Sequence, residues 1–137
     1  MRILFFAASV FIISQFYSCE NATNKSDFTF SEKFQNELLE KCISVEDGGT
    51  IDLPEGKFFL KKPLSVDGKK NVTIKGQGAG KTFISFKQQT EGGEGMLITN
   101  CINIIMEGFT VQDAKGDNIK LLNCDTVTIK EIGRAHV

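Results

Sequence analysis

The glycine-rich segment from Gly76 to Thr82, with the sequence GQGAGKT, comes close to a nucleotide-binding motif. A phosphate-binding loop has the pattern GxxxxGK[ST] and is followed by a helix whose N-terminus faces the phosphate. Here Lys75 occupies the position of the first glycine, and the residues after Thr82 have strand character. We therefore interpret the segment as a tight glycine turn between two strands and expect no nucleotide partner.

Four acidic residues could lie at turns and offer oxygen ligands to a cation: Glu107, Asp113, Asp117 and Asp125. Calcium needs several oxygen atoms that converge on one point. Asp113 and Asp117 flank one turn and are the candidate calcium ligands, although solvated turn carboxylates are the commoner alternative. Lys115 and Lys120 are available as bases, but no active-site motif matches, so the catalytic residues stay unassigned.

Three cysteines lie beyond the N-terminal region: Cys42, Cys101 and Cys124. No CxxC or histidine-rich spacing points to a metal site, and the only histidine is His136. Cys101 and Cys124 could form a disulfide or stack as buried thiols. We favour the stacked thiols, because free cysteine packs as a small hydrophobic residue.

A repeat of 23 residues relates segment 94–107 to segment 117–130 and aligns Asn100 with Asn123. Segment 71–76 aligns with 103–108 at a spacing of 32 residues, because a polar loop from Gln88 to Glu94 intervenes. Short alternating strands repeated at such spacings are typical of a β-solenoid. The loop is either a binding wall or, more commonly, a variable surface loop.

Alternation within these strands predicts which side chains face inward: Val72, Ile104 and Val127, then Ile74, Met106 and Ile129. The outward side chains include Lys75, Glu107 and Lys130, whose charges alternate from strand to strand. Opposite charges on adjacent strands add roughly 0.2–1 kcal/mol each, which favours this register. Asn100 and Asn123 should stack at a corner in left-handed backbone conformations.

The N-terminal region indicates export. Arg2 is followed by an apolar run over residues 3–13, which is shorter than the roughly 20 residues of a membrane span. The run leads to Ser18-Cys19, which resembles the lipobox of bacterial lipoproteins, where a small residue precedes the lipidated cysteine. We expect a signal peptide over 1–18, lipidation of Cys19 and a polar tether over 19–29. The protein would then be membrane-anchored in the periplasm or at the outer-membrane surface; ordinary secretion is the alternative.

One amphipathic helix is expected after the tether, with Ser31 as its N-cap and Asp47-Gly48-Gly49 ending it. Its apolar face should contain Phe34, Leu38, Leu39, Cys42 and Ile43. Such a helix can cover the exposed apolar end of a solenoid.

The residues after the helix carry a more specific pattern. Residues 48–64 read GGTIDLPEGKFFLKKPL, and residues 71–84 read NVTIKGQGAGKTFI. Over residues 30–131 the chain resembles the opening of pectate-lyase-like superfamily proteins. The resemblance implies an all-β fold, a right-handed parallel β-helix with a short N-terminal capping helix. It also implies lyase, hydrolase or epimerase activity on uronic-acid polymers, with calcium as a cofactor of the full-length protein.

Basic and acidic residues are nearly balanced over the chain. The chain has 16 basic and 17 acidic residues, a balance that gives no electrostatic reason to expect nucleic-acid binding.

Residues 132–137, IGRAHV, break the strand pattern and can be encoded by a widely used sequencing adapter, so we expect a non-native tail. We expect an exported lipoprotein that acts on or binds polysaccharide at the cell envelope. The alternative is a non-catalytic surface or structural module, with this chain inactive alone.

Overall fold

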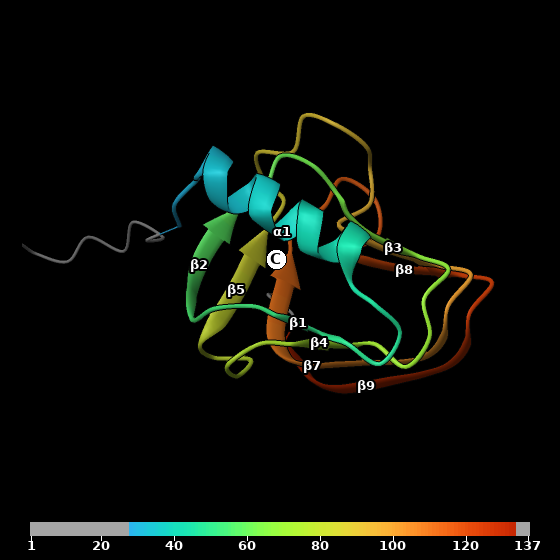
Figure 1. The fold of residues 1–137 in the computed structure, drawn as a ribbon. Helices are drawn as coiled ribbons and strands as arrows, with labels where there is room; N and C mark the ends of the chain where they lie inside the picture. The colour runs from blue at the N-terminus through green and yellow to red at the C-terminus, as the bar shows by residue number, and fades with distance from the viewer. Residues whose placement is uncertain (1–27, 134–137) are drawn as a thin grey trace, which may run out of the picture.

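The computed structural model describes residues 28–133, which form a parallel β-solenoid of about three turns with one short helix at its N-terminal end (Figure 1). The elements in chain order are α1 (Glu32–Ser44), β1 (Thr50–Asp52), β2 (Gly56–Phe59), β3 (Leu64–Asp67), β4 (Thr73–Lys75), β5 (Thr82–Ser85), β6 (Met96–Thr99), β7 (Ile102–Gln112), β8 (Ile119–Leu122) and β9 (Asp125–Gly133). The predicted all-β solenoid with a short helix is confirmed.

The strands form two parallel sheets. One has the order β1-β4-β7-β5-β2, with β9 also paired to β7, and the other has the order β3-β6-β8. The long strand β7 pairs with β4 along its first part and with β5 along its last part, so it bends around a corner of the coil. Each coil therefore pairs with the coil before it and the coil after it, as a solenoid requires.

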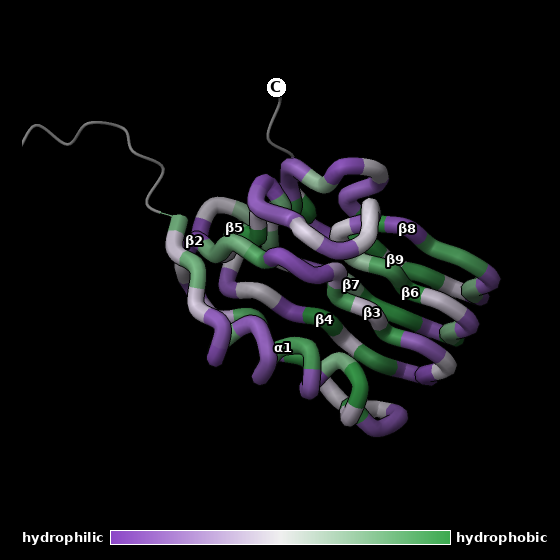
Figure 2. Tube along the Cα trace, turned by 90° about the horizontal axis from the view of Figure 1, so that it is seen from above, coloured by the Kyte–Doolittle hydropathy of each residue, from purple (hydrophilic) through white to green (hydrophobic). Residues whose placement is uncertain are grey.

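The strand register confirms both repeat spacings. The 23-residue repeat pairs Ile98 with Leu121 and Ile104 with Val127. The 32-residue spacing pairs Ile74 with Met106. The polar loop between β5 and β6 thus lengthens one coil without shifting the strands on either side. Figure 2 shows the result as stacked hydrophobic strand segments with hydrophilic residues at the corners.

Most of the predicted inward side chains lie in the core. Val72, Ile74, Ile104 and Met106 are fully buried, and Val127 is half-buried. Ile129, also predicted to face inward, is 50 % exposed. It pairs with Met106 as expected, but β9 is the last strand of the described stack, and no further coil covers it.

Helix α1 covers the first coil and packs against β3. The predicted N-cap is confirmed: the Ser31 hydroxyl accepts a hydrogen bond from the Phe34 backbone N–H at 3.2 Å. The predicted position of Ile43 is wrong, because its side chain is 72 % exposed. The buried face is centred on Leu38 and Cys42, and Ile43 lies about 100° around the helix from Cys42. Gln35 is buried instead, and its Oε1 accepts a hydrogen bond from the Lys61 backbone N–H at 2.7 Å.

Both ends of the described region extend the stack. Thr29, expected in the tether, pairs in parallel with Phe58 of β2. Ile132 and Gly133, expected in the tail, continue β9 and pair with Phe109 and Thr110. The predicted signal peptide, Cys19 and most of the tether lie outside the described residues, as do residues 134–137. Within 28–133, no helix is long and apolar enough to cross a membrane.

Candidate functional site

Two columns of left-handed residues build the corner between the two sheets. Asn100 and Asn123 have φ values of 53° and 54°, as predicted, and the Asn123 amide donates to Asn100 Oδ1 at 2.7 Å. Asn100 in turn donates to Asp67 Oδ1 at 2.9 Å. The second column was not predicted: Asn103 donates to Asn71 Oδ1 at 2.8 Å, and both residues have positive φ. These amides join neighbouring coils by hydrogen bonds. They do so at the corner where the chain enters strands β4, β7 and β9 of the first sheet.

The cysteines of this corner are free thiols. Cys101 is fully buried and Cys124 is half-buried. The Cys101 Sγ lies 3.6 Å from the Val66 carbonyl oxygen, and the Cys124 Sγ lies 3.3 Å from the Ile98 carbonyl oxygen. Each thiol thus contacts a carbonyl oxygen of the preceding coil and also one of its own coil, Thr99 for Cys101 and Leu122 for Cys124. Free thiols at these stacked positions agree with the alternative that the sequence favoured.

The outer face of the first sheet carries a column of alternating charge. The register places Asp52 beside Lys75, Lys75 beside Glu107 and Glu107 beside Lys130. The predicted three-residue column is therefore confirmed and is one residue longer. Among the described residues, none of these neighbours forms an ion pair within 4.0 Å, so the side chains remain free to contact a ligand.

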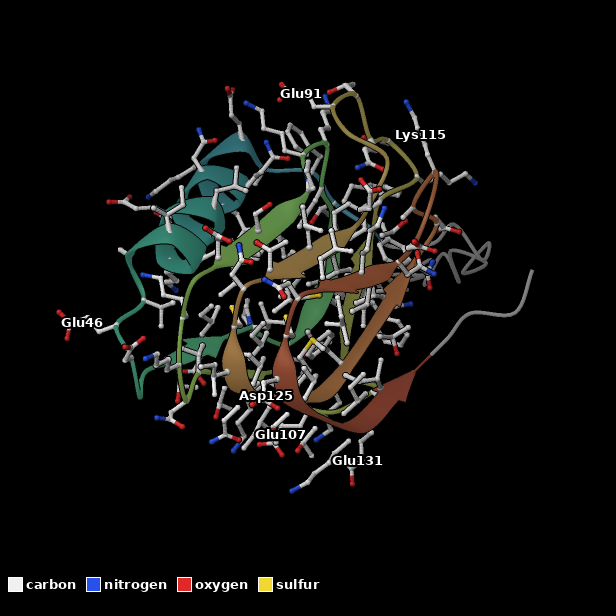
Figure 3. All side chains as sticks on the ribbon, turned by 90° about the vertical axis from the view of Figure 1, so that its right-hand side faces the viewer. Glu46, Glu91, Glu107, Lys115, Asp125 and Glu131 are labelled. Atoms are coloured by element: carbon white, nitrogen blue, oxygen red, sulfur yellow. The ribbon has the colours of Figure 1, made fainter. Side chains whose placement is uncertain are left out.

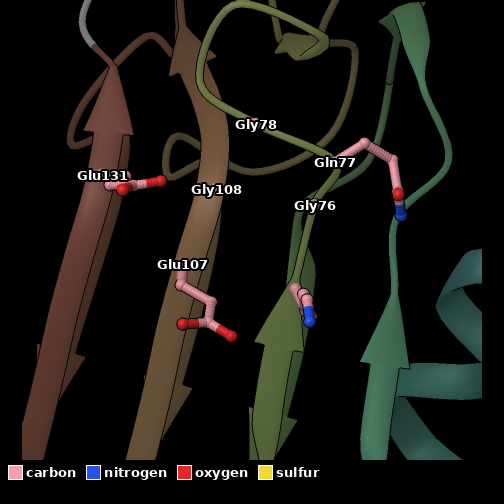
Figure 4. Close-up of a pocket in the computed structure, with 7 residues that line it drawn as sticks. Gly76, Gln77, Gly78, Glu107, Gly108 and Glu131 are labelled. Atoms are coloured by element: carbon pink, nitrogen blue, oxygen red, sulfur yellow. The ribbon is translucent and has the colours of Figure 1, made fainter.

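A shallow groove of about 240 Å³ lies next to this column and crosses β4, β7 and β9 (Figure 4). It is lined by Lys75, Gly76, Gln77, Gly78, Glu107, Gly108 and Glu131. The Glu107 and Glu131 carboxylates project over it, whereas the Gln77 side chain points away; the Gln77 amide donates to the Leu53 carbonyl at 3.3 Å. The groove thus combines an open backbone floor with charged groups of both signs.

Glycine is required in the floor of the groove. A Cβ at Gly76 would overlap the carbonyl oxygen of Gly108, and Gly108 has a φ of 72°. In the next coil, the equivalent left-handed position is held by Glu131, with a φ of 49°. The charges of Lys75 and Glu107 were predicted from the sequence, but the groove beside them was not. The alignment of 71–76 with 103–108 already placed Gly76 beside Gly108 and could have indicated it.

The segment from Gly76 to Thr82 is confirmed as a turn between β4 and β5. The Thr82 hydroxyl accepts a hydrogen bond from the Gln77 backbone N–H at 2.9 Å and donates to the Pro54 carbonyl at 3.1 Å. Thr82 therefore pins the turn to the preceding coil, and Gly76 and Gly78 become part of the groove floor.

The candidate calcium ligands are not brought into a ligand cluster. Asp113 Oδ2 accepts hydrogen bonds from the Ser85 hydroxyl at 2.7 Å and from the Gln112 amide at 2.9 Å. The Asp117 carbonyl accepts a hydrogen bond from the Gly95 N–H. In the part of the chain that the structure describes, no group of three or more His, Cys, Asp or Glu residues could hold a metal ion. These residues do not fit a calcium site, and we build no chemistry on one.

Lys120, considered above as a base, is paired with a carboxylate. Its Nζ donates a hydrogen bond to Glu94 Oε1 at 2.9 Å, and this hydrogen bond raises the pKa of Lys120. The same hydrogen bond lowers the pKa of Glu94. A lysine held in its charged form is poorly suited to accept a proton.

The loop from Gln88 to Glu94 belongs to the stack of coils. The Thr90 N–H donates to the Lys61 carbonyl at 2.9 Å, and the Gly93 carbonyl accepts from the Gly116 N–H at 2.7 Å. Gln89 is buried, and its amide donates to the Glu94 carbonyl at 2.8 Å. Figure 3 shows Glu91 of this loop on the edge of the molecule opposite Glu107 and Glu131. The loop therefore cannot form a wall of the groove.

Comparison with known proteins gives no match, either to a protein-family model, to a curated protein or to a solved structure.

Proposed function

We propose that this chain is an exported, membrane-anchored β-helix protein that binds polysaccharide along its outer face. The groove across β4, β7 and β9 carries the proposal. It is lined by residues of three successive coils, whose strands repeat at intervals of about 4.8 Å. A polymer of similar units can be bound by such a repeated surface.

The groups in the groove suit the hydroxyls of sugars. Carboxylates accept hydrogen bonds and an ammonium group donates them, while a hydroxyl can do both. These groups are supplied by Glu107, Glu131 and Lys75, and the glycine floor lets a sugar ring approach the backbone. The resemblance of residues 30–131 to pectate-lyase-like proteins supports a polysaccharide as the ligand, while the kind of sugar depends on the groups in the groove. It also supports right-handed coiling, the hand that parallel strand connections almost always take.

Affinity electrophoresis of the full chain, extracted from a bacterial host in mild detergent, would test binding. We expect polysaccharide cast in the gel to slow the protein, and Glu107→Gln and Glu131→Gln to reduce the retardation. Glu46→Gln is the matched control, because Glu46 is exposed and lies away from the groove (Figure 3). Equal loss in the control, or no retardation in any polysaccharide, would disprove the proposal.

Export and lipid anchoring form a separate part of the proposal, supported by the apolar run over 3–13 and by Ser18-Cys19. Labelling cells with a radioactive fatty acid should mark the wild-type chain and leave Cys19→Ser unlabelled. Unchanged incorporation in Cys19→Ser would rule out this anchor.

A further inference from the structure

We propose that the groove binds an uncharged polysaccharide and discriminates against polyuronates, an inference that rests on the proposed function. The outward column beside the groove reads Asp52, Lys75, Glu107 and Lys130, one residue from each successive strand. Attraction of a polyanion to each lysine is therefore offset by repulsion from the adjacent carboxylate.

The lining of the groove strengthens this discrimination. It contains one cation, Lys75, and two carboxylates, Glu107 and Glu131. Glu131 occupies a left-handed position that its neighbour Gly108 fills without strain, and its side chain projects over that glycine (Figure 4). A polymer with a carboxylate on every sugar would meet these two negative groups in the groove itself. Neutral hydroxyls would instead find acceptors there.

Because of the spacing of the coils, a polyuronate cannot avoid the carboxylates of the column by binding at another position along it. Neighbouring parallel strands lie about 4.8 Å apart, which is comparable to the length of one sugar unit. A chain lying across β4, β7 and β9 would present a carboxylate near every strand, opposite groups of both signs. If the polymer shifts by one coil, each of its carboxylates moves from a residue of one charge to a residue of the opposite charge. The total electrostatic energy of the complex therefore does not improve.

The test compares gels that contain a neutral glucan or mannan with gels that contain polygalacturonate or alginate, using the full chain at low protein concentration. We expect the wild type to be retarded by a neutral polymer and at least about ten-fold less by the polyuronates. Glu107→Lys leaves lysines on three consecutive strands and should produce polyuronate retardation that disappears at high salt. Glu131→Lys, which has no charged neighbour across the strand pair, should shift the preference in the same direction with less effect on folding.

Glu46→Lys makes the same change in net charge away from the groove and should leave the wild-type preference unchanged; a shift equal to that of Glu131→Lys would overturn the inference. Wild-type retardation by polyuronate as strong as by the neutral polymers would also overturn it, while the proposed polysaccharide binding would stand. Absence of retardation in every gel would instead remove the proposed function and the inference with it.

Discussion

Residues with a left-handed backbone conformation lie at the corners of the coils. The type of side chain at each of these positions determines how much the corner stabilises the folded state. Asparagine holds four of these positions: Asn71, Asn100, Asn103 and Asn123. Thr126, the residue that follows Asn71 and Asn103 in their column, has a φ of 55°. A β-branched residue is poorly suited to this conformation, because its Cβ substituents crowd the backbone.

Thr126→Asn should therefore stabilise the fold by about 1 kcal/mol. The new amide can donate to Asn103, as Asn103 donates to Asn71, and only an exposed hydrogen bond to Asp125 is lost. The measurement is the free energy of unfolding in urea. Thr128→Asn is the control, since Thr128 lies in the same strand without a positive φ; an equal gain there would contradict the explanation.

Cys42 should make stability depend on pH in alkaline solution. Its burial raises the pKa of the thiol from 9.0 to about 11. The folded state therefore favours the protonated thiol, so this contribution is fully present below pH 9 and is lost as the pH rises toward 11. The difference in free energy of unfolding between wild type and Cys42→Ala should shrink by about 2 kcal/mol between pH 8 and 11. A constant difference would show that Cys42 does not titrate in this way.

At the scale of the structural elements, the stacked side chains at a corner join neighbouring coils. Asn100 is bonded to Asp67 on one side and to Asn123 on the other. Asn100→Ala should cost about 2 kcal/mol, because it removes both bonds and places a Cβ without compensation in a left-handed conformation. Asn100→Gly removes the same bonds without that strain and should cost about half as much. Equal losses in chemical denaturation would show that the backbone conformation is unimportant.

Helix α1 stabilises the fold through the buried side chain of Leu38, and the exposed side chain of Ile43 adds little. Leu38 is 2 % exposed, so Leu38→Ala should cost about 2–5 kcal/mol of unfolding free energy and uncover the first coil. Ile43→Ala should change stability by less than about 0.5 kcal/mol, because its side chain is in solvent. A large loss in Ile43→Ala, measured by thermal unfolding, would mean that this helix face is covered.

The sequence predicted the strands and their register well, because alternation and the two repeat spacings depend on neighbouring coils alone. The pairing of Lys75 with Glu107 follows directly from such an alignment. The rotation of α1 was harder to predict, because the polar Gln35 is buried through a hydrogen bond to Lys61 that no periodicity reveals. The groove was missed because its floor is made of backbone, where Gly76 and Gly108 leave space instead of supplying a side chain.

At the scale of the whole molecule, the two ends of the described region differ. The first coil is covered by α1, whereas the last described coil exposes Leu121 and Leu122 on β8 and Ile129 on β9, the outermost strands of the two sheets. Open strand edges with apolar side chains promote pairing between molecules.

We therefore expect the chain to self-associate with increasing concentration, as measured by sedimentation velocity in detergent. Ile129→Lys should weaken this association, while Ile43→Lys, an equally polar change at the covered end, should not. A wild-type chain that stays monomeric over the whole concentration range would contradict this expectation.

The pairing of each coil with the one before it also gives the molecule a direction of assembly. Strand pairs such as β4 with β7, and amide bonds such as Asn103 to Asn71, join segments that are never more than about one coil apart. A ribosome or an export channel delivers the N-terminal residues first, so α1 and the first coil can provide a template before the later coils emerge. Each new coil then needs only the strands of the preceding coil to pair with. We therefore expect the solenoid to fold coil by coil, beginning at the end that α1 covers.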